Sequence, residues 1–212
     1  MKRPESDCPL CPRLASFRAE NRRRFPDFHN APVPSFGPAD ARLLVLGLAP
    51  GLKGANRTGR PFTGDYAGDL LYSTLLKFGF AQGSFAARPD DGLRLVDCRV
   101  SNAVRCVPPG NKPETAEIAA CNEFLKDEIA GLPKLRAVFA LGSIAHQALL
   151  RACGLRTSRF PFAHGARHEL PGGLVLIDSY HCSRLNTNTG RLTESMFHDA
   201  FGRAAEATTA QP

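Results

Sequence analysis

Four cysteines are spaced as ligands of one metal centre could be. Cys8 and Cys11 form a C-x2-C pair flanked by prolines, and Cys106 and Cys121 are separated by fourteen residues. Two intervening residues let a tight turn direct both sulfurs at one metal, so this spacing is typical of zinc and of iron-sulfur sites. The spacing alone leaves zinc, a 4Fe-4S cluster and no metal open. Three further cysteines are expected to be small buried apolar residues: Cys98, Cys153 and Cys182.

Three loops contain side chains that could bind and cleave a substrate. LAPGLKGANRTGRPFTGD contains Phe62 and Asp65, a second loop begins at Asn102, and SYHCSRLNTNTGR contains His181. An aromatic ring can stack on a base, a carboxylate can activate water, an amide offers both donor and acceptor, and a neutral imidazole can donate to a developing anion. Each residue also has a structural alternative: a core residue, a helix N-cap, a turn residue and a structural histidine, in chain order.

These loops follow predicted strands, which would bring them to one edge of a sheet. Continuous apolar runs, typical of parallel strands buried on both faces, predict strands at 42–47, 95–104, 136–141 and 174–179. Apolar residues at helical spacing predict helices at 66–80, 115–130 and 143–153. Strands that alternate with helices predict an α/β fold, a three-layer sandwich around a central, mainly parallel four-stranded sheet. Ligands of such sheets bind at the carboxyl ends of the strands, so we expect the chemistry in the loops that start at Gly47, Asn102, Gly142 and Tyr180.

The two ends of the chain are expected to lie outside this sheet. Residues 1–41, rich in proline, arginine and aromatic residues, predict a short helix followed by an irregular segment that wraps the core. The tail, residues 208–212, is expected to fray. A chain of 212 residues is long enough for one sizeable core, and we expect residues 1–212 to form a single domain.

Composition favours a polyanionic partner. Lysine and arginine total 27 against 20 acidic residues, a formal charge of +7, although a mild excess also occurs in proteins that never touch DNA. The sequence has no apolar run of membrane-spanning length and its N-terminus resembles no signal peptide, so we expect no membrane association and a cytoplasmic location. Seven cysteines, an odd number, argue against a disulfide framework in such a compartment.

Taken together, the loops resemble those of the iron-sulfur uracil-DNA glycosylases, specifically the type-b group, family 5. The resemblance is carried by GLAPGLKGANRTGRPFTGD, SNAVRCVPPGNKP and SYHCSRLNTNTGRLT, and extends from CPLCPRL to GRLTESMF, nearly the whole chain. It implies a uracil-DNA glycosylase-like fold and an enzyme that flips uracil, or a related deaminated or modified base, out of DNA and hydrolyses its N-glycosidic bond in base excision repair. It also implies a monomer in which a 4Fe-4S cluster acts as a structural clamp, bound by Cys8, Cys11, Cys106 and Cys121.

The resemblance assigns roles to the polar loop residues. Asp65 corresponds to the residue that activates water or stabilises the cation, and His181 to the histidine that bonds O2 of the leaving base. Phe62 corresponds to the aromatic on which the flipped base stacks, and Asn102 to the residue that reads the uracil edge. The type-b sequence pattern also has Leu48 and Ala49, without the polar residue that other families carry there, which leaves Asp65 as the acid.

Two glycines of the first loop are further candidates. The amides near Gly51 and Gly54 are expected to bind base carbonyls or phosphate. Gly54 aligns with a bulky residue that in related families contacts C5 of uracil. The missing side chain predicts activity on hydroxymethyluracil, and on hypoxanthine or ethenocytosine.

The loop after His181 offers DNA contacts. Arg184 and Arg191 are candidates for phosphate binding and Leu185 for an apolar wedge, with a solvated polar loop as the alternative. Three arginines elsewhere could add phosphate contacts or be surface charges: Arg57, Arg60 and Arg105.

Two other functions compete with base excision. One is a noncatalytic iron-sulfur protein that binds damaged or single-stranded DNA; intact Asp65 and His181 argue against it. The other is a zinc-stabilised nucleotide hydrolase, for which the sequence has neither a GxxxxGK[ST] motif nor an acidic Mg²⁺ cluster.

Overall fold

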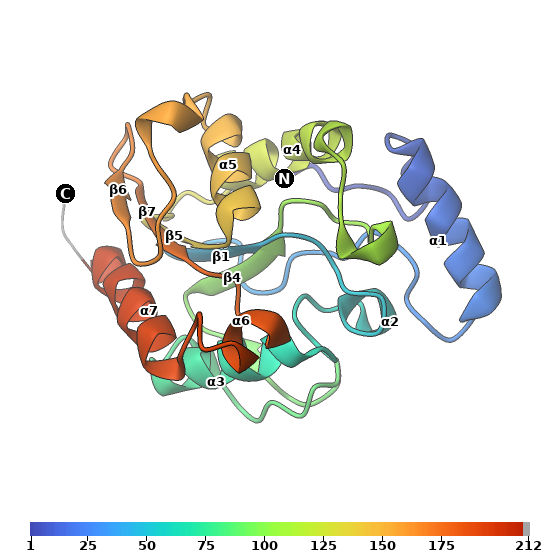
Figure 1. Ribbon diagram of the computed structural model, residues 1–212, viewed down its shortest axis with the longest axis horizontal. Coiled ribbons are helices and arrows are strands. Elements are labelled where there is room, and N and C mark those ends of the chain that lie inside the picture. Colours follow the sequence, from blue (N-terminus) through green and yellow to red (C-terminus); the bar gives the residue numbers. More distant parts are fainter. Residues whose placement is uncertain (210–212) are drawn as a thin grey trace.

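A five-stranded sheet lies at the centre of the computed structural model, which describes residues 1–209 (Figure 1). The strands lie in the order β4-β1-β5-β7-β6. Their bounds are β1 Leu43–Gly47, β4 Cys98–Asn102, β5 Ala137–Leu141, β6 Arg167–Glu169 and β7 Val175–Ser179. Strands β4, β1, β5 and β7 are parallel, whereas β6 is antiparallel to β7. The predicted α/β fold with a mainly parallel central sheet is confirmed.

The predicted number of four strands is wrong, because β6 adds a fifth at one edge. This strand consists of Arg167, His168 and Glu169, and within residues 1–209 it pairs with β7 alone. An edge strand is not buried on both faces, so it does not need the apolar run on which the prediction relied.

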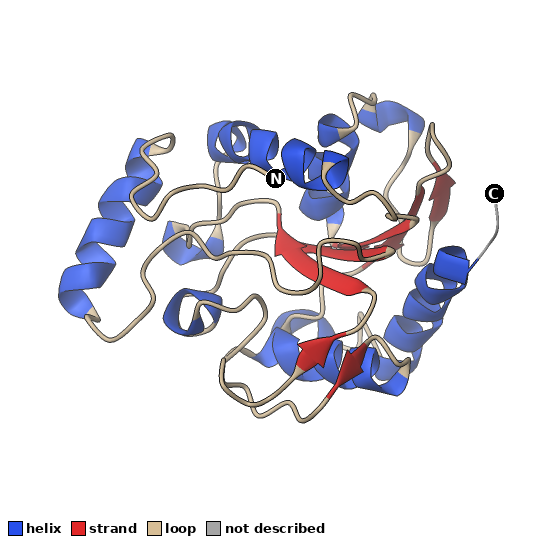
Figure 2. Cartoon of the chain, turned by 180° about the vertical axis from the view of Figure 1, so that it is seen from behind, coloured by secondary structure: helices blue, strands red, loops and turns tan. Residues whose placement is uncertain are grey.

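Helices cover both faces of the sheet (Figures 1 and 2). Helices α4 (Thr115–Ala130) and α5 (Ser143–Ala152) lie on one face, and α3 (Tyr66–Lys77) and α7 (Glu194–Thr209) on the other. Leu44 and Leu46 of β1 pack in the core that includes α4 and α5, whereas Leu43 and Val45 pack in the core that includes α3 and α7. Alternate side chains of one strand therefore supply two separate cores, which explains the continuous apolar runs.

Helix α7 has no counterpart among the predicted helices. Phe197 and Phe201 pack on Phe139 of β5, with ring centroids 5.4 Å and 5.3 Å apart. The expected fraying of the tail is wrong for Thr208 and Thr209, which belong to this helix, and the side chain of Thr208 is buried. Residues 210–212 of the predicted tail lie outside the described residues.

The predicted strand 95–104 divides into two elements. Asp97 adopts a left-handed backbone conformation (φ 52°), and its carboxylate accepts hydrogen bonds from the backbone and side chain of Arg42. The turn separates β3 (Arg94–Leu95) from β4, and β3 pairs instead with β2 (Ala81–Gln82) as a small antiparallel hairpin.

Residues 1–41 form helix α1 (Pro12–Arg24) and an irregular segment, as predicted. The segment lies along the main body of the chain: Asn30 N–H donates to Asn56 O, Val33 N–H donates to Arg105 O, and Phe36 forms a bridge with Val100 of β4. Four short helical turns complete the chain: α2 Ala55–Thr58, η1 Pro109–Asn111, η2 Thr157–Arg159 and α6 Arg184–Asn188. Within residues 1–209, none of the helices has the length and apolar character needed to cross a bilayer.

Candidate active site

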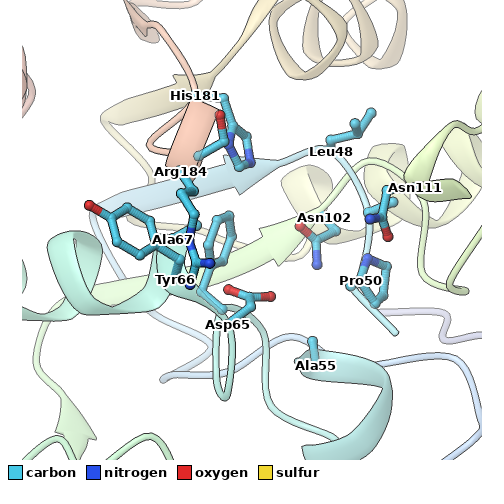
Figure 3. A pocket seen from close by; sticks show the side chains of 14 residues that line it. Leu48, Pro50, Ala55, Asp65, Tyr66, Ala67, Asn102, Asn111, His181 and Arg184 are labelled. Carbon is cyan, nitrogen blue, oxygen red and sulfur yellow. The ribbon is translucent and has the colours of Figure 1, made fainter. Parts of the chain in front are cut away.

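A cavity of about 410 Å³ lies at the carboxyl ends of the parallel strands (Figure 3). Register brings its walls together, because Gly47 at the end of β1 pairs with Asn102 at the end of β4, and Leu141 of β5 pairs with Ser179 at the end of β7. The loops after these strands supply the lining. Six residues predicted from the sequence line the cavity: Gly51, Phe62, Asp65, Asn102, His181 and Arg184.

Phe62 forms part of the cavity wall and is also part of the core. Its ring is buried, and it lies 6.0 Å from the ring of His181 at an interplanar angle of 27°. Its backbone has φ of 52°, a region that side chains other than glycine rarely adopt. A Cβ atom at Gly47 would overlap both the Phe62 ring and the Asn102 amide, so glycine at this position allows the two side chains to approach β1.

Asp65 occupies the N-cap position of α3, but its carboxylate does not act as a cap. The backbone has the extended conformation usual for an N-cap, yet the side chain accepts no capping hydrogen bond from the described residues. Its Oδ1 atom is buried and has no hydrogen-bond partner within residues 1–209. Burial raises the pKa of Asp65. A half-buried carboxylate with one buried, unpartnered oxygen beside a cavity is suited to bind a ligand or a water molecule.

Gly54 lies behind Asp65 and outside the cavity lining. A Cβ atom at Gly54 would overlap Oδ2 of Asp65, and the Gly54 N–H donates to Gly51 O at 3.2 Å. Gly54 is therefore directed toward the Asp65 carboxylate and is not among the residues that line the cavity, and its contact with a bound base stays a prediction.

Two asparagines border the cavity from the second loop. Asn102 is buried, and its Oδ1 has no hydrogen-bond partner within the described part of the chain. Asn111, which is not among the site residues predicted from the sequence, lies at the end of η1 in a left-handed conformation and also lines the cavity (Figure 3). Its place in the segment SNAVRCVPPGNKP was the available signal.

His181 follows β7 and contributes its ring to the cavity wall. Its carbonyl oxygen accepts a hydrogen bond from Asn186 Nδ2 at 2.8 Å, whereas its ring nitrogens make no hydrogen bond to residues 1–209. Burial lowers the pKa of His181 to about 4, so the imidazole is neutral at physiological pH. A neutral ring beside the cavity has one N–H donor to offer a ligand.

The segment after His181 forms the short helix α6 and not a solvated polar loop. The Ser183 side chain caps it by accepting a hydrogen bond from Asn186 N–H. Leu185 is 72% exposed. The Arg184 guanidinium lies 5.2 Å from the ring centroid of Tyr66, and that of Arg191 lies 4.5 Å from the ring centroid of Tyr180.

Two of the three additional arginines are buried in ion pairs. Arg60 forms two hydrogen bonds with Asp91, and Arg105 forms an ion pair with Glu128. They are neither surface charges nor candidates for phosphate contacts. Arg57 is exposed.

The four candidate metal-binding cysteines line one cavity of about 20 Å³, and no disulfide forms among the described cysteines. Burial raises the pKa of the Cys106 thiol to about 12 and that of Cys11 to about 11. Arg18 Nη1 donates to Cys106 Sγ at 3.6 Å, and the Arg105 backbone N–H donates to Cys121 Sγ at 3.4 Å. The other three cysteines lie elsewhere: Cys98 and Cys182 are buried, and Cys153 is half-buried at the end of α5.

A second cluster of potential ligands, His146, His168 and Asp178, is satisfied by hydrogen bonds. The Asp178 carboxylate accepts from His146 Nδ1 at 2.8 Å and from His168 Nε2 at 3.2 Å, and Phe160 O accepts from His146 Nε2 at 2.8 Å. These hydrogen bonds account for the cluster as a structural contact between α5 and β7.

The fold and the cavity are those of the family whose sequence model, "Uracil DNA glycosylase superfamily", matches residues 34–204. The chain belongs to this superfamily. Its similar relatives include type-5 uracil-DNA glycosylases of Thermus thermophilus (49% identity, covering 93% of this chain and 92% of the relative), Mycobacterium bovis (44%, covering 94% and 77%) and Pyrobaculum aerophilum (38%, covering 94% and 88%). A type-4 uracil-DNA glycosylase of Pyrobaculum aerophilum is 34% identical over 65% of this chain.

Proposed function

We propose that the protein is a DNA glycosylase that excises uracil, and related deaminated or modified bases, by hydrolysing the N-glycosidic bond. The main support is a pair of buried, unpartnered oxygen atoms, Asp65 Oδ1 and Asn102 Oδ1, beside one cavity. Buried polar atoms usually have a partner, so two without one in the described chain indicate that a ligand supplies it. The names of the type-5 uracil-DNA glycosylase relatives support a base of DNA as that ligand.

Asp65 and His181 have opposite tasks in bond cleavage. Breaking the bond leaves positive charge on the sugar and negative charge on the base. The Asp65 carboxylate is suited to stabilise the cation and to orient or deprotonate the attacking water. The neutral His181 ring is suited to donate a hydrogen bond to O2 of the base as it leaves, without bringing a fixed charge into the site.

The remaining lining residues would hold the base. A flipped base would stack on the Phe62 ring, and the Asn102 amide offers a donor to O4 and an acceptor to N3–H of uracil. The Gly51 backbone lies at the cavity wall, where its amide can bind a base carbonyl. Asn111 adds a second amide to this wall.

DNA would be bound outside the cavity by α6 and the segment after it. Arg184 and Arg191 are exposed and can contact phosphates, and Leu185 projects where an apolar side chain could replace the flipped base in the stack. Activity on hydroxymethyluracil, and on hypoxanthine or ethenocytosine, stays part of this proposal, but it no longer relies on space left by Gly54. It relies on the easier opening of mismatched or damaged pairs.

We also propose that Cys8, Cys11, Cys106 and Cys121 hold a 4Fe-4S cluster, which would clamp the N-terminal segment to the middle of the chain. Arg18 supports an anionic group at this position: the residue is 5% exposed, its guanidinium donates to Cys106 Sγ and Cys8 O, and no carboxylate of the described residues pairs with it. A buried guanidinium needs a nearby negative charge, and four metal-bound thiolates would provide one.

The proposal also covers the domain organisation, the oligomeric state and the location of the chain. We propose that residues 1–212 act as one domain, as a monomer, in the cytoplasm at the nucleoid. The competing function, noncatalytic binding of damaged DNA by an iron-sulfur protein, would need neither the Asp65 carboxylate nor the His181 ring beside the cavity.

The test is an oligonucleotide with a single uracil opposite guanine. Free uracil and an alkali-labile abasic site are expected from the native protein, and much less of both from Asp65→Asn at equal times. Binding of this oligonucleotide without release of uracil would support the noncatalytic function and overturn the proposal.

A further inference from the structure

Asn186 of α6 connects the exposed Leu185 to the backbone of His181. Its side-chain Nδ2 donates to His181 O at 2.8 Å, and its backbone oxygen accepts from Leu192 N–H at 3.0 Å. Its own N–H donates to Ser183 Oγ at 3.4 Å. Leu192 is a buried core residue. Asn186 is therefore fixed on three sides and contacts the chain at the point from which the His181 ring projects.

The opposite side of α6 is held by the residue that follows Asp65. Thr187 Oγ1 donates to the hydroxyl of Tyr66 at 3.2 Å, and the Arg184 guanidinium lies over the Tyr66 ring. Figure 3 shows Arg184 beside Tyr66 at the cavity wall. Helix α6 thus spans the space between the backbones that carry Asp65 and His181.

The His181 ring depends on this backbone contact for its position. Its nitrogens make no hydrogen bond to the described residues, and the ring packs beside Phe62 at 6.0 Å. Gly142 does not press on His181, because even a Cβ atom added to Gly142 would lie 3.6 Å from His181 Cβ, an ordinary contact distance. The hydrogen bond from Asn186 Nδ2 to His181 O therefore links the position of α6 to the position of His181.

We propose that Asn186 is a positioning residue, through which insertion of Leu185 into the DNA stack aligns His181 with the leaving base. This inference rests on the proposed function. Leu185 and Asn186 are adjacent in one short helix, so a force on the exposed leucine moves the amide that holds the His181 carbonyl. Base flipping and leaving-group stabilisation would then be coupled, and the full rate would be reached only when the stack has been filled.

The experiment is a double-mutant cycle with Leu185→Ala and Asn186→Ala on a uracil duplex, measured as single-turnover rates with saturating enzyme. Each single variant is expected to lose about tenfold, and the double variant to lose little more than either, because contacting residues of one unit are not additive. On single-stranded DNA, which has no stack to fill, Leu185→Ala should have little effect and the cycle should show no coupling. Losses that multiply in the double variant on the duplex would overturn the inference.

Asn188 provides a matched control in the same helix. Its side chain makes no hydrogen bond to residues 1–209, so Asn188→Ala should keep the native rate. Asn186→Asp preserves size while removing the donor, and Asn188→Asp adds the same charge to α6 without touching His181. We expect the rate of Asn186→Asp to fall well below that of Asn188→Asp at equal DNA affinity. Equal rates for these two variants would also overturn the inference, even if Asn186→Ala fails to fold.

Failure of the inference and failure of the proposed function give different results. If the native protein and Asn188→Ala release no uracil, the proposed function fails. If both release uracil and the cycle is additive, only the role of Asn186 fails.

Discussion

Asp65 illustrates a conflict between stability and activity at a single residue. Because burial raises its pKa, the folded state favours the protonated carboxyl, and the ionised form destabilises the fold as pH rises through that pKa. Asp65→Asn removes the buried charge and keeps the size. We expect Asp65→Asn to raise the melting temperature at neutral pH by about 2 °C or more, and to lower single-turnover cleavage by roughly 10² or more.

The pH dependence of the melting temperature provides a control for Asp65→Asn. The difference in melting temperature should shrink as pH is lowered, because the native carboxyl becomes protonated. His181→Ala should lose a comparable factor in rate, roughly 10², by removing the donor to the base. Near-native cleavage by Asp65→Asn would show that another group stabilises the sugar cation.

The dependence of rate on pH should report Asp65 and not His181. The carboxylate must be ionised, so the single-turnover rate should fall as pH drops, with a midpoint above the ordinary aspartate value of about 3.9. Burial lowers the pKa of His181 to about 4, so the ring stays neutral through the physiological range. A change in the native rate with a midpoint near the ordinary histidine pKa of about 6.5 would contradict this assignment. In Asp65→Asn, the part of the acid limb that lies above the His181 pKa of about 4 should disappear from the residual rate.

Gly54 shows what the sequence could not reveal at this scale. The motif identifies the residue, but only the fold of the loop places its Cα against Asp65. Gly54→Ala should therefore displace the carboxylate and lower the rates on uracil and hydroxymethyluracil by the same factor, about tenfold or more. Gly202→Ala, in α7, is a control, because its Cβ would make only ordinary contacts with Phe78. A changed ratio of the two rates would restore Gly54 to the C5 edge of the base.

At the scale of elements, the buried strands and the helices α3, α4 and α5 follow from the sequence, whereas α7, β6 and α6 were not predicted. The four parallel strands agree with their predicted bounds to within one residue, apart from β4, which Asp97 shortens. Helix α7 could have been predicted, since Phe197, Ala200, Phe201 and Ala204 have helical spacing. Strand β6 and helix α6 had no such pattern, because one lies at a sheet edge and the other is only five residues long.

The loop between Cys106 and α4 links the cysteine site to the cavity. It contains Asn111, five residues after Cys106, in the left-handed turn that faces the cavity. We expect purified protein to be brown and to contain four irons and four sulfides, as a 4Fe-4S cluster requires. Cys106→Ala should lose the iron and reduce yield and solubility before any effect on chemistry is measurable.

Cys153→Ala is the matched control for this variant, because Cys153 lies outside the cysteine cavity. It should retain iron and activity. Colourless, active protein with stoichiometric zinc would refute the iron-sulfur proposal while leaving the clamp in place.

For the whole molecule, the charge of +7 should act through particular arginines and not as a uniform field. Arg184→Ala and Arg191→Ala should each reduce the slope of log Kd against log salt by about 1, if each contacts one phosphate. Lys134→Ala is the control. This residue precedes β5 at the amino ends of the parallel strands, whereas the cavity lies at their carboxyl ends, and it pairs with Asp40. An unchanged slope for either arginine variant would remove that residue from the DNA interface.

The position of the four cysteines has a consequence for protein synthesis. Cys11 leaves the ribosome long before Cys106 and Cys121, and at about 5–20 residues per second the delay is roughly 5–20 seconds. Strand β1 cannot pair during this interval either, because its neighbours β4 and β5 are synthesised later. During this interval the N-terminal thiols lack the two later cysteines of their cavity. Helix α1 is therefore synthesised first and docks late, so the proposed cluster could be completed only late in translation, when the nascent chain has brought all four sulfurs within reach.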